Sequence, residues 1–335
     1  MSDFEVLQLV GEGNFSQVFK IQNRVTKKIY ALKKQKKEGD PSFVIEVRIM
    51  KALGNHPNII NLISVLENND IITDLMDMNL FQFMRRYDFP IPEEKALNIT
   101  KQILSGLSYI HSKHIYHRDM KPENIMINRQ SLEVKIGDFG SADFISTNPR
   151  DHYVITRYYR PPEVLLNAGY YDEKVDVFGV GCILFEMMRT RPLFAGRNSE
   201  EQLEIIHKIL GTPDMDTFET MKRYCRIDME LTFPVYEPSN LHSLLPRASD
   251  KCIDLLHCLI EYSPLKRISA EAALKHPAFT QPPPKVIISP KGSVQSLMQI
   301  PTRPVINKMK PPIHRLRPGL MSQKKVLFVP TIARK

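Results

Sequence analysis

Two short motifs at the centre of the sequence hold the residues best suited to chemistry. One is the run HRDMKPEN, which contains Asp119, Lys121 and Asn124; the other is DFG, whose Asp138 follows Asn124 by fourteen residues. Asp119 could accept a proton from a hydroxyl group, Lys121 could reach a phosphoryl group in transit, and Asn124 and Asp138 offer hard oxygen ligands for Mg²⁺. Phosphoryl transfer needs positioning and charge neutralisation, which this set supplies. The alternative, a charged loop followed by a turn, would require chance agreement at many positions.

Residues near the start of the chain could complete a phosphate site, although each pattern is weak alone. Gly11 and Gly13 lie between predicted strands, where glycine lets the backbone turn sharply and approach phosphate oxygens. Ser16 stands where a third glycine would be, and a tight hairpin without a ligand fits equally well. Lys33 could neutralise the α- and β-phosphates if Glu46 held it in place. The alternative for Lys33 is a solvated position in a basic run.

The apolar pattern predicts a β-rich beginning and a helical remainder. Strand-like alternation occurs at 1–35, 59–66 and 70–75. Between them a helix should begin at Asp40 and Pro41, place Glu46 on its apolar face, and end at Leu53 before Gly54. Helical spacing marks 93–113, 174–190, 199–210, 250–260 and 269–275. A small β-rich lobe and a larger helical lobe are therefore expected.

The formal net charge of +9 is concentrated at the C-terminal end. Residues 281–335 contain 11 Lys or Arg and no Asp or Glu, which leaves 35 basic and 37 acidic residues in 1–280. The body of the chain is nearly neutral, so a nucleic-acid partner is not expected. Ten prolines among these 55 residues predict a disordered tail. The basic tail could still dock a partner.

Bulk composition places the chain among ordinary globular proteins. It has 335 residues, of which 42% are hydrophobic and 25% charged, and no apolar run approaches the length of a membrane span. The start, MSDFEVLQLV, lacks the basic region of a secretory signal. Four widely spaced cysteines favour reduced thiols over a disulfide or zinc framework. We therefore expect a cytoplasmic or nuclear protein without a transmembrane segment.

Taken in order, the glycine-rich loop, strand lysine, helix glutamate, HRDxKxxN and DFG resemble the eukaryotic protein kinase family. Glu163 follows two prolines where the family has Ala-Pro-Glu, and Asp176 precedes Phe178 where the family usually has a tryptophan. Arg267 matches the arginine that pairs with this glutamate. The resemblance implies an α+β bilobal kinase fold, with a small β-rich N-lobe at 1–76 and a larger helical C-lobe at 77–280. It also implies ATP and Mg²⁺ as cofactors.

Further motifs resemble the CMGC group, which contains the cyclin-dependent and mitogen-activated kinases. These are the run TRYYRPPE from Thr156 to Glu163 and ILGTP at 209–213, followed by an irregular stretch over about 213–246 that resembles the group's insert. The runs DLMDMNL and GDFGS are most similar to the male-germ-cell-associated and ciliary kinase branch. The resemblance implies protein substrates with Ser or Thr followed by Pro. Thr156 should lie near Asp119 and favour Ser or Thr over Tyr.

The resemblance also assigns the nucleotide site. Thr73 would lie at the back of the adenine pocket, and Asp74, Leu75 and Met76 would form the hinge that offers backbone groups to adenine. The residues expected to contact ATP are Gly11, Glu12, Gly13, Val18, Ala31, Lys33, Thr73, Asp74 and Met76.

The activation loop departs from the pattern of the related kinases. Those kinases carry a phosphorylated Thr-x-Tyr, whereas this chain has Asp151 in place of the threonine and keeps Tyr153. Asp151 could supply part of the negative charge of a phosphothreonine, or it could be an ordinary exposed aspartate. Tyr153 is predicted to be a regulatory site. The candidate anion partners in this region are Arg118, Arg157 and Arg160.

Two other classes of function remain to be weighed. A pseudokinase would need a broken catalytic part, yet Lys33, Glu46, Asp119, Asn124 and Asp138 are all present. A binding protein that acts through its basic tail is the second alternative; the tail contains one aromatic residue, Phe328, which does not suggest stacking on bases. A monomeric enzyme is expected, and the branch resemblance adds the cilium or flagellum as a location.

Overall fold

The computed structural model of the chain divides into two units, Met1–Pro284 and Lys285–Lys335, and all the residues that it describes belong to the first unit. The described ranges are 3–13, 16–37, 39–87, 90–145, 155–166, 170–226 and 233–280. The predicted disordered tail, 281–335, lies outside the described residues and stays a prediction, as do the exact lobe boundaries.

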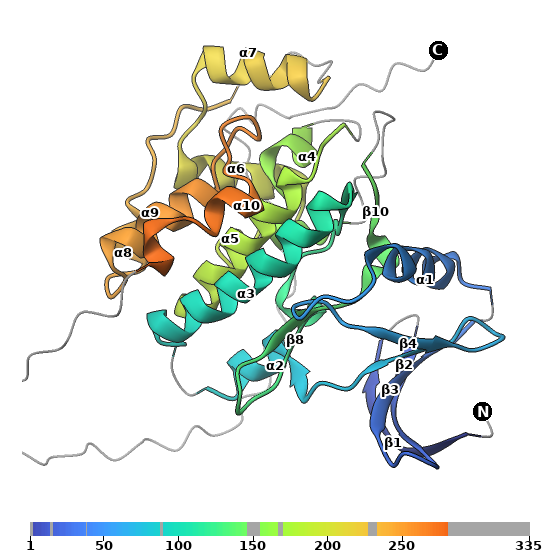
Figure 1. Ribbon diagram of the computed structural model, residues 1–335. Coiled ribbons are helices and arrows are strands. Elements are labelled where there is room, and N and C mark those ends of the chain that lie inside the picture. The colour runs from blue at the N-terminus through green and yellow to red at the C-terminus, as the bar shows by residue number, and fades with distance from the viewer. Residues whose placement is uncertain are drawn as a thin grey trace, which may run out of the picture. The chain divides into compact units, whose positions relative to one another are not determined.

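The N-lobe is built on an antiparallel sheet of five strands in the order β1-β2-β3-β5-β4 (Figure 1). The strands are β1 (Phe4–Glu12), β2 (Ser16–Asn23), β3 (Ile29–Gln35), β4 (Leu62–Val65) and β5 (Ile71–Asp74). Side chains alternate between the two faces of a strand. One face buries Ile21, Leu32 and Ile72 in a small apolar cluster. The opposite face is therefore the one that can serve a ligand.

Helix α1 (Pro41–Leu53) packs beside this sheet and confirms the helix predicted from the sequence. The Asp40 side chain accepts a hydrogen bond from the Ser42 amide at 2.9 Å, and Pro41 occupies the first turn. Gly54 ends the helix with a φ of 65°, a left-handed value that suits glycine. Glu46 lies on the buried face, as its spacing predicted.

The C-lobe is helical and surrounds helix α5 (Lys174–Arg189), which is buried along almost its whole length beside α3 (Glu93–Ser112) (Figure 1). The other helices are α2 (Leu80–Arg85), α4 (Pro162–Leu166), α6 (Ser199–Leu210), α7 (Met215–Tyr224), α8 (Leu241–Leu244), α9 (Asp250–Leu259) and α10 (Ala270–Ala273). Four predicted helices are confirmed to within one residue. The fifth, 269–275, is shorter than expected: Ser269 is the N-cap, since its side chain accepts from the Ala272 amide, and the chain turns after Ala273.

Two small sheets carry the central motifs. One contains β6 (Met78–Asn79), β8 (Ile125–Ile127) and β9 (Val134–Ile136), and the other pairs β7 (Ile115–Tyr116) with β10 (Asp143–Phe144). Short 3₁₀ turns end the HRDMKPEN motif, overlap DFG and precede α4: they are η1 (Pro122–Asn124), η2 (Phe139–Ser141) and η4 (Arg157–Tyr159). The architecture is the expected α+β bilobal fold. No helix among the described residues is long and apolar enough to cross a membrane.

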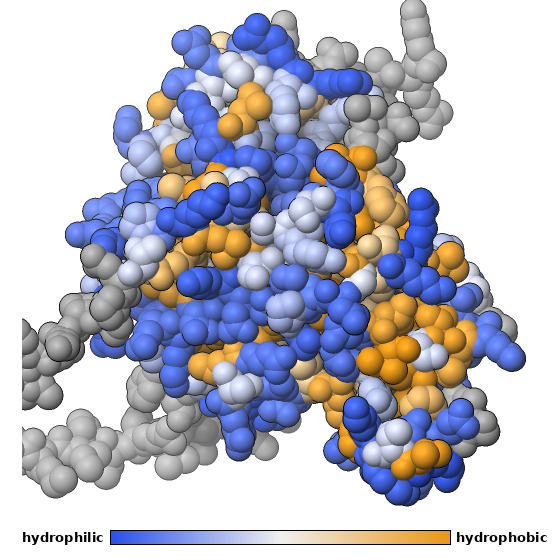
Figure 2. Space-filling model, viewed as in Figure 1, coloured by the Kyte–Doolittle hydropathy of each residue, from blue (hydrophilic) through white to orange (hydrophobic). Residues whose placement is uncertain are grey.

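The surface of the two lobes differs in character. Figure 2 shows hydrophilic side chains over much of the helical lobe, and apolar side chains gathered over the region of the N-lobe sheet. The exposed apolar residues of β1 are Val6, Leu7, Leu9 and Val10, and those of α1 are Val44 and Ile45. The N-lobe therefore exposes more of its apolar side chains than the C-lobe does in this view.

A buried ion pair ties the C-lobe together. The Arg267 guanidinium donates to both carboxylate oxygens of Glu163, at 2.7 and 3.0 Å, and neither side chain is more than 1% exposed. Arg267 also donates to the main-chain carbonyls of Glu261, Lys174 and Tyr262. A buried pair is tolerated when its remaining donors are satisfied in this way. The predicted pairing of these two residues is therefore present in the fold.

His207 of α6 is a buried base whose protonation should make folding sensitive to acid. Its Nε2 lies 2.8 Å from the Tyr262 hydroxyl, its ring packs against Phe233, and burial lowers the pKa of His207 to about 4. The unfolded chain takes up this proton as the pH falls below about 6.5, whereas the folded chain does not. The folded state is therefore penalised increasingly as the pH falls from about 6.5 towards 4.

We expect this residue alone to lower the free energy of unfolding by about 2 kcal/mol between pH 7 and pH 5. Chemical denaturation of wild type and His207→Gln at both pH values measures it, because glutamine stays neutral and can still bond Tyr262. The variant should lose correspondingly less stability on acidification. His242→Gln, which replaces a half-exposed histidine on α8, is the control and should keep the wild-type slope. Equal pH slopes in wild type and His207→Gln would contradict the prediction.

Candidate active site

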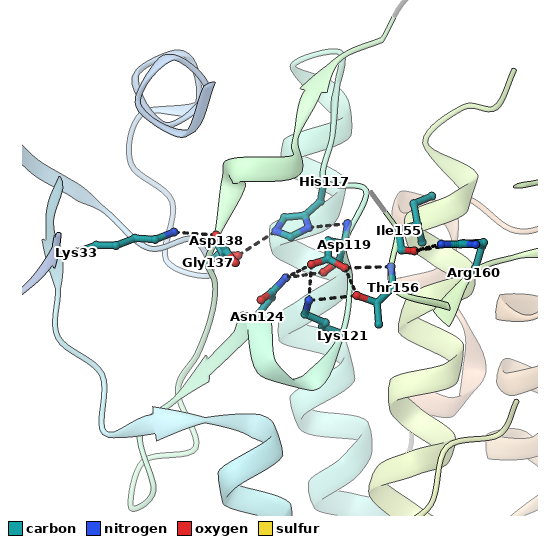
Figure 3. Close-up of polar contacts among 10 residues, drawn as sticks. All are labelled: Lys33, His117, Asp119, Lys121, Asn124, Gly137, Asp138, Ile155, Thr156 and Arg160. Carbon is teal, nitrogen blue, oxygen red and sulfur yellow. Dashed lines mark hydrogen bonds and ion pairs between the residues drawn. The ribbon is translucent and has the colours of Figure 1, made fainter. Parts of the chain in front are cut away.

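The carboxylate of Asp119 is the centre of the candidate site (Figure 3). Thr156 Oγ1 donates to its Oδ1 at 2.6 Å, while Lys121 Nζ and Asn124 Nδ2 donate to its Oδ2 at 2.6 and 3.0 Å. Lys121 Nζ also donates to Thr156 Oγ1 at 3.1 Å. The structure thus brings together four residues that the sequence placed in one site. The donors fix the carboxylate in a single orientation.

Asp176 of α5 bonds the main chain of the segment that precedes Asp119. Its two carboxylate oxygens accept the amide protons of His117 and Arg118, each at 2.8 Å, and Oδ2 also lies 3.0 Å from His111 Nε2. Asp176 is 1% exposed. Arg118 has a φ of 68°, which a non-glycine residue keeps only when its surroundings hold it there. The predicted structural role of Asp176 thus has a definite geometry.

His117 connects the two motifs to each other. Its Nδ1 accepts from the Asp119 amide at 3.3 Å, so that Nε2 carries the proton and donates to the Gly137 carbonyl at 2.9 Å (Figure 3). The His117 side chain is fully buried. The distance between Asp119 and Asp138 is therefore constrained, because one imidazole bonds both the Asp119 amide and the carbonyl of Gly137, the residue before Asp138.

Lys33 of β3 reaches from the N-lobe to both carboxylates predicted to surround it. Its Nζ lies 2.7 Å from Glu46 Oε2 and 2.8 Å from Asp138 Oδ1. Burial alone would lower the pKa of Lys33, but the two carboxylates raise it above its ordinary value. Burial raises the pKa of Glu46, and for Asp138 the attraction of Lys33 outweighs burial and lowers the pKa. The ammonium is therefore firmly charged and joins α1 to the DFG motif.

Asn124 and Asp138 fit the Mg²⁺ that their residue types suggested. The Asn124 amide nitrogen donates to the main-chain and side-chain oxygens of Asp119, so its oxygen can face a cation. Lys33 donates to Oδ1 of Asp138. Among the described residues no side chain is seen to bond Oδ2, so this oxygen can face the same cation as Asn124. Two hard oxygens from two motifs suit Mg²⁺, which keeps several waters and bridges phosphates.

A second group of metal-ligand types lies on the C-lobe and does not fit a metal. Ligand atoms of Asp254, Cys258 and His276 lie within 4.8 Å of one another. However, His276 Nδ1 accepts the Ala278 amide at 3.2 Å, so Nε2 carries the proton and donates to Asp254 at 3.1 Å. A neutral imidazole with both nitrogens engaged has no lone pair left for a metal. This group is a hydrogen-bonded cap at the turn that starts with Pro277.

The sheet register places the predicted ATP residues on one face. Val18 pairs with Gly11 on one side and Lys33 on the other, and Ala31 pairs with Thr73. Directly paired residues and residues two apart along a strand share a face. These residues therefore line the face opposite the Ile21 cluster, and Glu46 reaches Lys33 from that side. Of the remaining predicted contacts, Glu12 pairs with Lys36 at 2.7 Å and Gly13 donates to the Ser16 carbonyl in the turn.

The segment predicted to be the hinge is fastened by residues that sequence reasoning missed. Asp74 accepts a hydrogen bond from Asn61 Nδ2 at 2.8 Å and lies 3.3 Å from Lys135 Nζ, while Thr73 Oγ1 donates to the Asp74 carbonyl. Met76 is buried beside them. Asn61 and Lys135 lie far apart in the sequence and belong to no motif, so no local signal links them to Asp74. The side chain of Asp74 thus fastens this segment to Asn61 and Lys135.

The residues predicted to be regulatory are placed in different surroundings. Arg160 is buried, and its Nε and Nη2 donate to the Ile155 carbonyl at 3.2 and 2.6 Å (Figure 3), whereas Arg157 donates to the Arg197 carbonyl at 2.5 Å. Arg118 donates to the Ser141 carbonyl at 2.6 Å. Each arginine is bonded to main chain. Asp151 and Tyr153 lie outside the described residues, so their roles stay predictions.

Comparison with known proteins agrees with this geometry. Residues 4–279 match the model of the protein kinase domain. The chain is 35% identical to the human MAPK/MAK/MRK overlapping kinase over 84% of its own length and 68% of that protein. It is 37% identical to the Caenorhabditis elegans cyclin-dependent kinase 4 homolog, over 83% and 71%, and 38% identical to cyclin-dependent kinase F-3 of Oryza sativa subsp. japonica, over 83% and 65%.

The chain belongs to the protein kinase family. Within it, the chain is a serine/threonine protein kinase of the CMGC group, as the motifs predicted. ATP and Mg²⁺ are the substrate and cofactor of this family.

A test of the nucleotide site uses Thr73, whose small side chain should leave space at the rear of the adenine pocket. We expect Thr73→Met to lower the affinity of inhibitors that extend into this space by about 10-fold or more, because the longer side chain occupies it. Affinity for ATP should change little. Competition against a fluorescent ATP analogue measures both. Thr26→Met, at an exposed turn, is the control and should match wild type. Unchanged inhibitor affinity in Thr73→Met would refute its placement.

Proposed function

We propose that this kinase transfers the γ-phosphate of ATP to Ser or Thr hydroxyls that precede a proline, with Asp119 as the catalytic base. The observation that carries the proposal is the set of donors around the Asp119 carboxylate, from Thr156, Lys121 and Asn124. An oriented carboxylate can accept the hydroxyl proton as the phosphoryl group leaves ATP. Lys121, 2.6 Å from the same carboxylate, is near enough to neutralise charge on the transferred group.

The remaining roles follow from the charges at the site. Lys33, held by Glu46, would bind the α- and β-phosphates, while the sheet face with Gly11, Val18 and Ala31 would cover the nucleotide. Asn124 and Asp138 would hold Mg²⁺, which supplies neutralisation of phosphate charge when it is bound. Thr156, bonded to the base, would help to place a Ser or Thr hydroxyl rather than a longer Tyr. Glu163, Asp176 and Arg267 would support the site from the C-lobe.

The preference for proline is supported by the bond between Arg160 and the Ile155 carbonyl. Ile155 precedes Thr156, which contacts Asp119, so the substrate residue after the acceptor should lie along this segment. The Ile155 carbonyl already accepts two guanidinium hydrogen bonds and offers little to a substrate amide. An unsatisfied buried amide costs about 1–3 kcal/mol. Proline has no amide proton and avoids this cost.

The test compares phosphate transfer to matched Ser-Pro and Ser-Ala peptides by wild type and Asp119→Asn. Loss of the base should lower kcat by about 100-fold or more, because asparagine cannot accept the proton. Wild type should favour Ser-Pro by about 10-fold or more in kcat/KM. Asp250→Asn removes an exposed carboxylate and is the control, with unchanged rates. Transfer by Asp119→Asn at the wild-type rate would overturn the assignment of the base, and equal use of both peptides would overturn the preference for proline.

We further propose that the basic tail serves recognition rather than catalysis. The tail carries 11 positive charges without a negative one and could dock an acidic partner. Tyr153 is proposed as a regulatory site, with Asp151 contributing part of the charge of a phosphothreonine. The proposed enzyme is a monomer of the cytoplasm, with the nucleus or the cilium as further locations.

Deleting 281–335 should separate the role of the tail from catalysis. We expect the shortened enzyme to keep wild-type kcat and KM for a Ser-Pro peptide, because no proposed catalytic residue lies in the tail, and to lose its wild-type distribution in cells. Imaging of fluorescent fusions and peptide kinetics measure the two properties. A full-length variant with its tail lysines and arginines changed to glutamine should behave like the deletion. A tail-less enzyme that is distributed as wild type would contradict the docking role.

A further inference from the structure

Arg118, the residue before the proposed base, is a buried cation whose position affects the catalytic loop directly. It is 8% exposed, its backbone is left-handed, and its amide is bonded to Asp176. Asp176 fixes the main chain of the loop on one side. The side chain of Arg118 provides a second attachment of the loop, through the groups that bind its guanidinium. A buried guanidinium is stable only with hydrogen-bond acceptors and a nearby negative charge.

The guanidinium has two described contacts in the segment after DFG, and it also forms a hydrogen bond with the Tyr171 side chain. Nε donates to the Ser141 carbonyl at 2.6 Å, Nη2 lies 3.8 Å from Asp143 Oδ2, and the group packs over the Tyr116 ring at 5.5 Å. Asp143 begins β10 and pairs directly with Tyr116 of β7, the strand that leads into the HRD motif. The small sheet therefore delivers a carboxylate to the side of Arg118. Its side chain is 30% exposed, so solvent can still reach it.

The same strand also contacts the helix that carries Glu46. Arg48 of α1 lies over the ring of Phe144, 4.9 Å from its centroid, next to Asp143. A cation–π contact of this kind holds one element against another with a modest energy. β10 thus touches both the catalytic loop, through Asp143 and Arg118, and helix α1, through Phe144 and Arg48. A change at Asp143 should be felt at both.

We propose that Asp143 is a positioning residue for the reaction: its carboxylate holds Arg118, and through Arg118 the loop that presents Asp119. The inference rests on the proposed role of Asp119 as the base. Many kinases order this region by phosphorylation, when a phosphate pairs with arginines. In this chain the Asp143 carboxylate lies beside Arg118 without any phosphorylation. The enzyme should therefore keep the catalytic loop positioned when no residue is phosphorylated.

The experiment measures steady-state kinetics of phosphatase-treated full-length enzyme on a Ser-Pro peptide. Wild type should be active in this state. Asp143→Ala and the isosteric Asp143→Asn should lower kcat by about 10- to 100-fold, as expected when a base is misplaced, with a smaller change in the KM for ATP. Asp143→Glu should restore most of kcat, because it returns the charge. Glu5→Gln, which removes the carboxylate of an exposed pair with Arg24 at 3.7 Å, is the matched control and should keep wild-type kcat.

Two further measurements distinguish this role from a loss of folding. Acetate should raise the kcat of Asp143→Ala in a saturable manner, whereas chloride at equal ionic strength should not. In an Arg118→Ala background, Asp143→Ala should cause no additional loss, because its effect passes through the arginine. Wild-type kcat in dephosphorylated Asp143→Ala and Asp143→Asn, or equal losses with and without Arg118, would overturn the proposal. Failure of the base assignment would be seen separately, as transfer by Asp119→Asn.

Discussion

The catalytic loop depends on one buried carboxylate, that of Asp176. An irregular loop has few backbone partners of its own, and each buried amide must find an acceptor. Asp176 accepts two consecutive amides, from His117 and Arg118, and thereby holds the left-handed backbone that precedes Asp119. Because α5 is buried along almost its whole length, this acceptor cannot move without disturbing the core of the C-lobe. The position of the proposed base is thus set by a helix in the core of the C-lobe.

The second constraint is electrostatic and joins the two lobes. Lys33 comes from the N-lobe sheet, Glu46 from α1 and Asp138 from the DFG motif, which lies 105 residues after Lys33 in the sequence. The ammonium of Lys33 can pair with both carboxylates only when the sheet, helix α1 and the DFG motif are packed against one another. His117 then relates Asp138 to Asp119 through the Gly137 carbonyl. A nucleotide bound by Lys33 would therefore meet a base whose distance is already fixed.

Sequence patterns predicted the parts of this arrangement that are local. The ends of α1 follow from Asp40, Pro41 and Gly54, because capping and glycine preferences act within a few residues. Asp119 and the three residues that bond its carboxylate were found by their motif spacing and by resemblance. The anchors of the hinge were not, since Asp74 meets Asn61 and Lys135 only after three separate strands or loops have assembled. The link from Arg118 to Asp143 is of the same kind, because it depends on the pairing of two strands of two residues each.

The three arginines predicted to be anion partners each bond a main-chain carbonyl, and their binding of an anion stays a prediction. A guanidinium can bind an anion, but it can equally satisfy carbonyl groups in segments that lack a regular ladder. Here Arg118, Arg157 and Arg160 each bond a different carbonyl, those of Ser141, Arg197 and Ile155. These bonds fix the segments on both sides of the activation loop to the C-lobe. Irregular backbone near Asp119 is thus held by side chains rather than by a regular hydrogen-bond ladder.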